Sequence, residues 1–314
     1  MPCVAGRAIT RERLVRTLTF WLRPAFALRV VNRFQKIVGF DRSIALASSA
    51  LTALVPLAIL TGAVLSGVVH YDAAERIVNR YHLTGSGAEA VHMLLDPPEG
   101  ASASVGLLGV VFLTISTLSF ARAVQRLFEQ AWELKPLSVR NTRNDLLWIV
   151  GLGAYAAVLG WIQAMLGGGR LGLAAALSEA PVTAVFLAWS GRILSGKRIG
   201  PSKLIPFGII AAVLTAAYSV GANVYLPRLF NSYAARYGAV GAVFAMISAL
   251  FAAMLVIVAS AALGREMHDE LTRIRAGSRP SDHEIRRQWD SILDQARMRW
   301  RTAREQVTHH RPKD

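Results

Sequence analysis

The sequence has little cysteine, few acidic residues and no cluster of histidines, and each shortage excludes a class of protein. Its one cysteine, Cys3, cannot form an intramolecular disulfide, so a disulfide-stapled fold and a cysteine metal site are both excluded. The seven histidines are scattered and form no ligand motif, whereas metal-dependent hydrolysis of RNA needs several converging His, Asp or Glu ligands. We therefore expect no metal centre, no cofactor, no nuclease activity and no other enzymatic activity.

Charge is absent from whole stretches of the chain. Residues 43–69 contain no Asp, Glu, Lys, Arg or His. At ~1.5 Å per residue, a helix of this length crosses the ~30 Å hydrocarbon core of a bilayer. The run lacks the alternation of a barrel strand, so a helix is the structure that satisfies its backbone in lipid. With 53% hydrophobic residues and a mean hydropathy of +0.38, the composition predicts a polytopic membrane protein rather than a soluble enzyme.

Five further apolar runs extend this prediction to an all-α bundle of six transmembrane helices. The fourth run is the least regular, because Glu179 and Pro181 interrupt it. Ser178 with these two residues resembles a helix start, which would leave 167–178 as a surface or re-entrant segment. The alternative is a full span from Leu171 with a buried carboxyl group. The predicted spans are about 43–69, 101–121, 146–169, 174–194, 204–226 and 237–264.

The basic residues divide the segments between the spans into two sets. Thirty of the 35 Lys and Arg residues lie in one set, and the positive-inside rule places that set, with both termini, in the cytoplasm. This distribution accounts for most of the net charge of +15 without any nucleic-acid partner. The basic set comprises residues 1–42, 121–145, 192–203 and 265–314; the other set comprises 70–100, 167–170 and 227–236.

Both flanking segments have an amphipathic pattern. Residues 1–42 alternate arginine with apolar and aromatic residues, which predicts a basic helix lying on anionic lipid headgroups. The charged tail at 265–314 contains a capping box, Ser281 with Glu284, and a helical apolar pattern that runs on to 307. We expect a cytoplasmic helix there. Its apolar face needs a partner surface, which is the protein's own loops, a second copy, another protein or the membrane.

Polar and helix-bending residues inside the spans are the candidates for a transport cavity. An ionisable group at membrane depth is costly, so Glu179 is a functional candidate, although capping a short fourth helix explains it equally well. Small residues in the last span predict close helix packing instead. The charged residues at 265–270 are expected to form a solvated collar with ion pairs within the helix, not a metal site. The cavity candidates are Glu179, Ser49, Pro56, Gln163 and Asn223; the packing stripe is Gly241, Ala245, Ala249 and Ala253.

Four motifs in order between residues 30 and 270 resemble the BrkB/YihY family of bacterial inner-membrane proteins. The first span contains ALASSALTALVPLAIL, with an internal proline, Pro56, and it follows an acidic residue, Asp41. The second motif, AVQRLFEQAW, lies at 123–132. YLPRLFNSY precedes YGAVGAV at 237–243, and GREM ends the last span. The sequence departs from the family pattern at two places: relatives commonly carry aromatic residues at 48 and 49, and an asparagine where Glu129 stands.

The resemblance implies six transmembrane helices, a location in the bacterial plasma membrane and a role in the cell envelope. It carries no catalytic residue over to this chain. We expect a protein that handles or transports a lipid or another amphipathic envelope component. The rival hypothesis is a scaffold, without transport activity, that recruits partners through the helix at 281–307.

Overall fold

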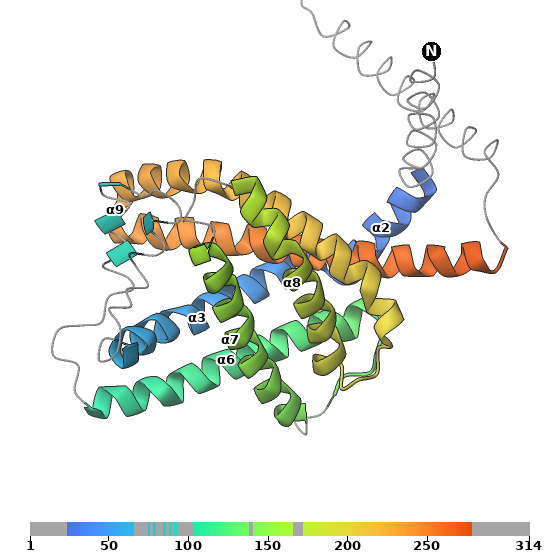
Figure 1. The fold of residues 1–314 in the computed structure, drawn as a ribbon, viewed down its shortest axis with the longest axis horizontal. Coiled ribbons are helices and arrows are strands. Elements are labelled where there is room, and N and C mark those ends of the chain that lie inside the picture. The colour runs from blue at the N-terminus through green and yellow to red at the C-terminus, as the bar shows by residue number, and fades with distance from the viewer. Residues whose placement is uncertain are drawn as a thin grey trace, which may run out of the picture. The chain divides into compact units, whose positions relative to one another are not determined.

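The computed structural model describes residues 24–65, 103–137, 141–165 and 172–277, with isolated positions between 75 and 92. Every regular element in these ranges is a helix, so the all-α prediction is confirmed for the described residues (Figure 1). The predicted partner helix at 281–307 and the first 23 residues of the basic segment lie outside them. The helices are α2 (Pro24–Lys36), α3 (Gly39–Leu65), α6 (Ala103–Ala131), α7 (Thr142–Met165), α8 (Gly172–Leu194) and α9 (Pro201–Arg275).

Three helical stretches are long and apolar enough to cross a membrane. They are Thr142–Ile162, Pro201–Gly238 and Val240–Arg275. The pair Pro24–Lys36 and Gly39–Leu54, which is bent by 52°, adds a fourth if it is counted as one span. The described residues therefore support three or four spans, and the full number of six stays a prediction.

The longest element, α9, is two helical arms folded back on each other at Gly238. Gly238 has φ 57° and ψ −139°, a conformation that glycine adopts far more readily than other residues. The arms run antiparallel, and the Tyr218 hydroxyl donates a hydrogen bond to the Ala249 carbonyl at 2.8 Å. The first arm continues past 226, the predicted end of the fifth span, so the predicted loop at 227–236 is helical.

Packing explains why the first arm continues. Leu226, Leu229 and Phe230 recur at a helical spacing and are buried in one cluster with Ala242 and Ala245 of the second arm. This burial favours the helix even though Pro227 lies inside it.

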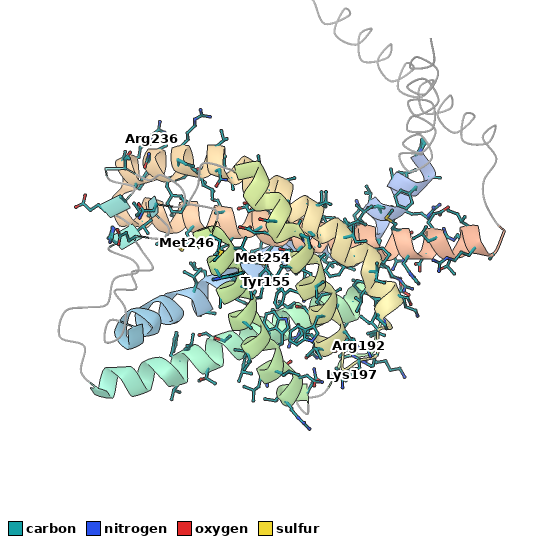
Figure 2. The ribbon with its side chains drawn as sticks, in the orientation of Figure 1. Tyr155, Arg192, Lys197, Arg236, Met246 and Met254 are labelled. Atoms are coloured by element: carbon teal, nitrogen blue, oxygen red, sulfur yellow. The ribbon has the colours of Figure 1, made fainter. Side chains whose placement is uncertain are left out.

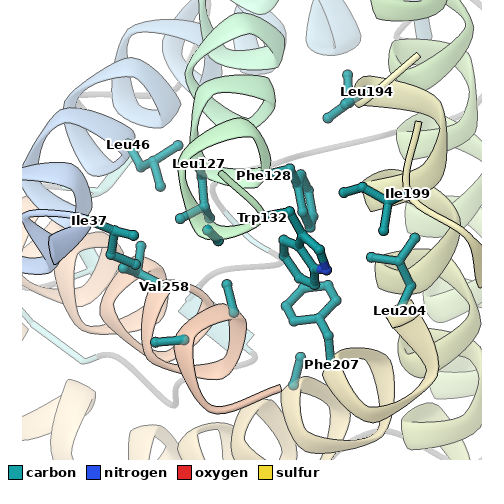
Figure 3. Close-up of a cluster of buried hydrophobic side chains, with 14 of the residues drawn as sticks. Ile37, Leu46, Leu127, Phe128, Trp132, Leu194, Ile199, Leu204, Phe207 and Val258 are labelled. Atoms are coloured by element: carbon teal, nitrogen blue, oxygen red, sulfur yellow. The ribbon is translucent and has the colours of Figure 1, made fainter. Parts of the chain in front are cut away.

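An aromatic cluster joins α6 to the start of α9 (Figure 3). The ring of Phe207 contacts Phe128 and Trp132 edge to face, with centroids 5.4 and 5.8 Å apart. Ile37 and Leu46 are buried in the same cluster, which extends it to the region of α3. The segment 123–132, which the sequence marks as a motif, therefore forms the centre of this core.

A turn joins α8 to α9 and also contacts α6. The Lys197 N–H donates to the Arg192 carbonyl at 2.8 Å, and Gly196 and Lys197 both adopt positive φ (Figure 2). The turn places Arg198 against α6, where its Nη2 lies 3.1 Å from the Glu129 carboxylate. Glu129 also accepts hydrogen bonds from the Gln125 amide at 2.9 Å and from a backbone N–H at 2.8 Å.

Residues 24–33 and 269–277 belong to a second compact unit, separate from residues 34–268. Within this second unit the Glu270 side chain is 2% exposed and accepts a hydrogen bond from Arg29 Nη2 at 2.6 Å. Arg33 contacts Asp269 at 3.5 Å. The expectation of a solvated collar is therefore wrong at Glu270, because Arg29 of α2 supplies a partner that the local sequence pattern does not reveal. The expected ion pair within the helix is confirmed there, because Arg273 lies 3.5 Å from the same carboxylate.

Candidate functional site

The residues predicted to line a transport cavity are spread over four helices. Ser49 of α3, Glu179 of α8 and Asn223 of α9 are half-buried, and none of them lines a pocket described below. Pro56 lies within α3 and Gln163 within α7, and their side chains are outside the described part of the structure. Their role in a cavity stays a prediction.

The start of α8 contradicts one of the two alternatives for Glu179, the capping of a short helix. This helix begins at Gly172, so Glu179 lies about two turns inside it and does not cap its N-terminus. The Glu179 carbonyl accepts a hydrogen bond from the Thr183 hydroxyl at 2.9 Å, and Pro181 is accommodated within the helix. The segment at 172–178 is thus part of the helix.

The stripe of small residues lies on the second arm of α9. Gly241 and Ala245 are buried, and a Cβ atom at Gly241 would overlap the Tyr233 carbonyl of the first arm. The backbones of the two arms therefore approach closely at this end of the hairpin. Ala249 and Ala253 are half-buried, and Ala253 lines a cavity.

A partly open cavity of about 240 Å³ lies between α6, α7, α8 and α9. Its wall is mainly apolar and includes Phe120, Trp148 and Met254. The Trp148 Nε1 donates to the Ser190 hydroxyl at 2.9 Å, so that polar pair is satisfied. The Thr215 hydroxyl also lines the cavity and is buried without a hydrogen-bond partner. The cavity is therefore an apolar space with one polar group available to a ligand.

A larger hollow, an open groove of about 520 Å³, lies between α7 and α8. Its walls include Val158 and Val185, which are 42% and 70% exposed. At Gly151 an added Cβ would overlap the Trp189 ring, so the glycine lets this indole lie against α7. Exposed apolar side chains around a concave surface suit contact with lipid better than contact with water.

Two aromatic residues, Tyr155 and Phe186, line both the groove and the cavity. Their rings stack with centroids 4.2 Å apart and an interplanar angle of 6°. The Tyr155 hydroxyl of α7 shares a hydrogen bond of 3.0 Å with the Thr183 hydroxyl of α8, which holds the tyrosine ring against α8 (Tyr155 is labelled in Figure 2). The stacked pair is therefore a partition, a part of the wall that the two hollows share.

The partition gives a first prediction. Tyr155→Phe removes the hydroxyl but keeps the stack, and Thr183 retains its bond to the Glu179 carbonyl. We expect a loss of about 0.6–1.7 kcal/mol, the range for hydrogen bonds between membrane helices. Thermal unfolding in detergent measures this, with Tyr155→Ala as the comparison that also removes the ring. Equal losses for both variants would contradict the role given to the stack.

Within the described residues, no group of three or more His, Cys, Asp or Glu side chains is placed to hold a metal ion. The residues that line the two apolar hollows carry no charge. The arrangement can therefore hold a hydrocarbon chain by burial of apolar surface, with hydroxyl groups to orient it.

Comparison with known proteins places the chain in a family. No solved structure matches it. Two UPF0761 membrane proteins of Stenotrophomonas maltophilia, from strains K279a and R551-3, are each 26% identical to it over 274 residues, which cover 80% of this chain. The match spans 64% of the length of these relatives. The family described as Virulence factor BrkB matches residues 30–284, which is most of the sequence, so the chain belongs to the BrkB family of membrane proteins.

Proposed function

We propose that the protein binds a lipid or another amphipathic component of the bacterial envelope and moves it between the bilayer and the interior of the helical bundle. The supporting observation is the shared wall of the groove and the cavity. Tyr155 and Phe186 line both the groove and the cavity, so a hydrocarbon chain in the groove lies against the wall that it shares with the cavity. The ligand enters sideways from the lipid, and its chain needs no aqueous path.

The energetics of the two hollows favour an apolar chain over a polar solute. Transfer of a chain from the bilayer into the groove exchanges one apolar environment for another, so its cost is small. The two volumes, 520 and 240 Å³, fall near the range of about 300–1,000 Å³ that is typical of ligand pockets. The plasma membrane location and the cytoplasmic placement of both termini, inferred from the basic residues, are part of this proposal.

Filling the cavity tests the proposal. Ala253 lines the cavity, whereas Ala217 is exposed on the first arm of the same hairpin. In liposomes that contain the purified protein, we expect the wild type to accelerate redistribution of a fluorescent phospholipid between leaflets. Ala253→Leu should lower that rate at least about tenfold, the factor that corresponds to about 1.4 kcal/mol.

The matched control is Ala217→Leu, which adds the same side chain outside the cavity and should retain the wild-type rate. Thermal unfolding of both variants shows whether a lost rate reflects a lost fold. Equal rates for the two variants, or no redistribution by the wild type with any major envelope lipid, would contradict the proposed function.

A further inference from the structure

A third hollow, of about 300 Å³, has a different chemistry from the groove and the cavity. It lies at the C-terminal end of α6, next to the start of α7, and it shares no lining residue with either apolar hollow. Five charged or amide side chains on α6 line it together with Asp145 of α7, namely Arg122, Gln125, Arg126, Glu129 and Gln130. We refer to it as the arginine pocket.

Each carboxylate of the arginine pocket lies near one basic group, and the Oδ1 atom of Asp145 is buried without a hydrogen-bond partner. Glu129, which is 5% exposed, accepts a hydrogen bond from Arg198 at 3.1 Å. Asp145, which is 2% exposed, lies 4.0 Å from the Nε of Arg122. Each acidic residue that lines the pocket therefore has one arginine as its basic partner. Any other arginine at the pocket adds positive charge that no carboxylate of the pocket balances.

The excess comes from two arginines that have no acidic partner in the described part of the chain. Arg126 lines the pocket and is exposed. The Nη2 of Arg42, on α3, donates to the side-chain oxygen of Gln130 at 2.5 Å, and its Nε is buried without an acceptor. Arg42 does not line the pocket itself, but its bond to Gln130 holds its guanidinium beside the pocket and near that of Arg126. Two like charges held together beside a hollow lose their mutual repulsion when an anion binds between them.

The chemistry of the side chains selects the anion. A guanidinium group presents several N–H donors in a plane and binds phosphate oxygens in a bidentate manner, with bonds that are stronger than those between neutral groups. Arg122 and Arg126 are four residues apart, so they lie on the same face of α6. The pocket also lies beside the start of α7, a stretch long and apolar enough to cross a membrane, and the basic end of such a stretch is where lipid headgroups are expected.

We propose that the arginine pocket binds the phosphate group of a phospholipid headgroup, with Arg126 and Arg42 supplying the charge and Arg122 a further donor. This inference rests on the proposed function for the identity of the molecule that carries the phosphate. It concerns a different site, however, from the apolar groove and cavity. A phosphorylated lipid is thereby the substrate class of the protein. The apolar hollows select its acyl chain by burial of apolar surface, and the arginine pocket selects its headgroup by charge.

Binding of two soluble lipids to the purified full-length protein tests the proposal. The probes are a short-chain phosphatidylglycerol and the diacylglycerol with the same chains, which lacks the phosphate. Arg126→Gln breaks no ion pair, so the fold should persist. We expect Arg126→Gln to weaken phosphatidylglycerol binding about tenfold and Arg42→Gln/Arg126→Gln to weaken it further, with diacylglycerol binding unchanged.

Controls separate the pocket from general surface charge. Arg143 of α7 and Lys203 of α9 are exposed basic residues outside the pocket, so Arg143→Gln and Arg143→Gln/Lys203→Gln match the two variants in charge. They should bind both lipids as the wild type does. Losses equal to those of the pocket variants, or no loss in Arg42→Gln/Arg126→Gln, would overturn the assignment of the pocket.

A third binding measurement identifies the source of the phosphate. Inorganic phosphate alone should bind much more weakly than phosphatidylglycerol, because it gains nothing from an acyl chain. Equal affinities would overturn the lipid assignment in favour of a free phosphate ion. If the pocket variants bind phosphatidylglycerol normally while Ala253→Leu still blocks redistribution, the arginine pocket proposal fails and the proposed function stands.

Discussion

The variant Gly264→Ala is expected not to accumulate as a folded protein. Gly264 lies on the second arm of α9, and a Cβ atom there would lie 2.5 Å from the Cα of Phe207 on the first arm. A backbone atom cannot rotate away as a side chain can, so the two arms must separate. Phe207 is fully buried among the rings of Phe128 and Trp132, so this separation also opens the aromatic core. We expect the free energy of unfolding to fall by about 3 kcal/mol, the upper end of the usual cost of overpacking.

The control for this variant is on the same hairpin. Gly221 is helical and exposed, and no atom beyond its chain neighbours and its own helix backbone lies within 4 Å of the position its Cβ would occupy. Gly221→Ala should be neutral or stabilising by up to about 1 kcal/mol, because alanine favours the helix. Yield of monodisperse protein and thermal unfolding in detergent measure both variants. Normal unfolding of Gly264→Ala would mean that the arms do not approach as closely as described.

The sequence predicts the class of the fold because the signal is local. A long run without charge requires a helix in lipid whatever surrounds it, and the runs beginning near 146, 204 and 237 correspond to α7 and to the two arms of α9. The end of the first arm is less predictable. Charged residues such as Arg228 suggest a loop after 226, whereas the helix continues because its apolar face packs on the second arm. That packing depends on residues distant in sequence.

The candidate site is harder to predict, for a physical reason. Ser49, Gln163 and Asn223 are candidates because they are polar, whereas the described cavity has a mainly apolar wall. A site for a hydrocarbon chain is made of the same residue types as a packed core, so composition cannot distinguish the two. Tyr155 and Phe186 are 31 residues apart, and neither carries a local signal of their stacking.

The ion pair of Glu129 and Arg198 is a further feature that only the fold reveals. The two residues are 69 positions apart, and the sequence marks Glu129 only as a departure from its relatives. Arg198 reaches it because the turn after α8 closes through positive-φ residues. The arginine also donates from Nε to the Ser195 carbonyl at 2.8 Å and from Nη1 to the Lys135 carbonyl at 2.6 Å. One side chain therefore links the turn, α6 and the segment after α6.

Arg198→Met is expected to destabilise the protein by about 3–5 kcal/mol, the cost of leaving a buried charge without its partner. Glu129 is 5% exposed, and after the substitution its carboxylate retains only neutral donors. Glu129→Gln should cost less, because a neutral amide needs no counter-charge. The double variant Arg198→Met/Glu129→Gln should therefore be more stable than Arg198→Met, a non-additivity that a double-mutant cycle of unfolding in detergent measures.

Lys203→Met controls for the loss of a basic residue on this side of the bundle, because Lys203 is exposed and no ion pair is described for it. It should unfold as the wild type does. If the energies of Arg198→Met and Glu129→Gln simply add, the two side chains do not act as a pair, and the loss in Arg198→Met comes from its two carbonyl contacts. If they couple as expected, Glu129 is neutralised by Arg198. The charge on Arg126 is then left for an anion, which is the condition that the arginine pocket requires.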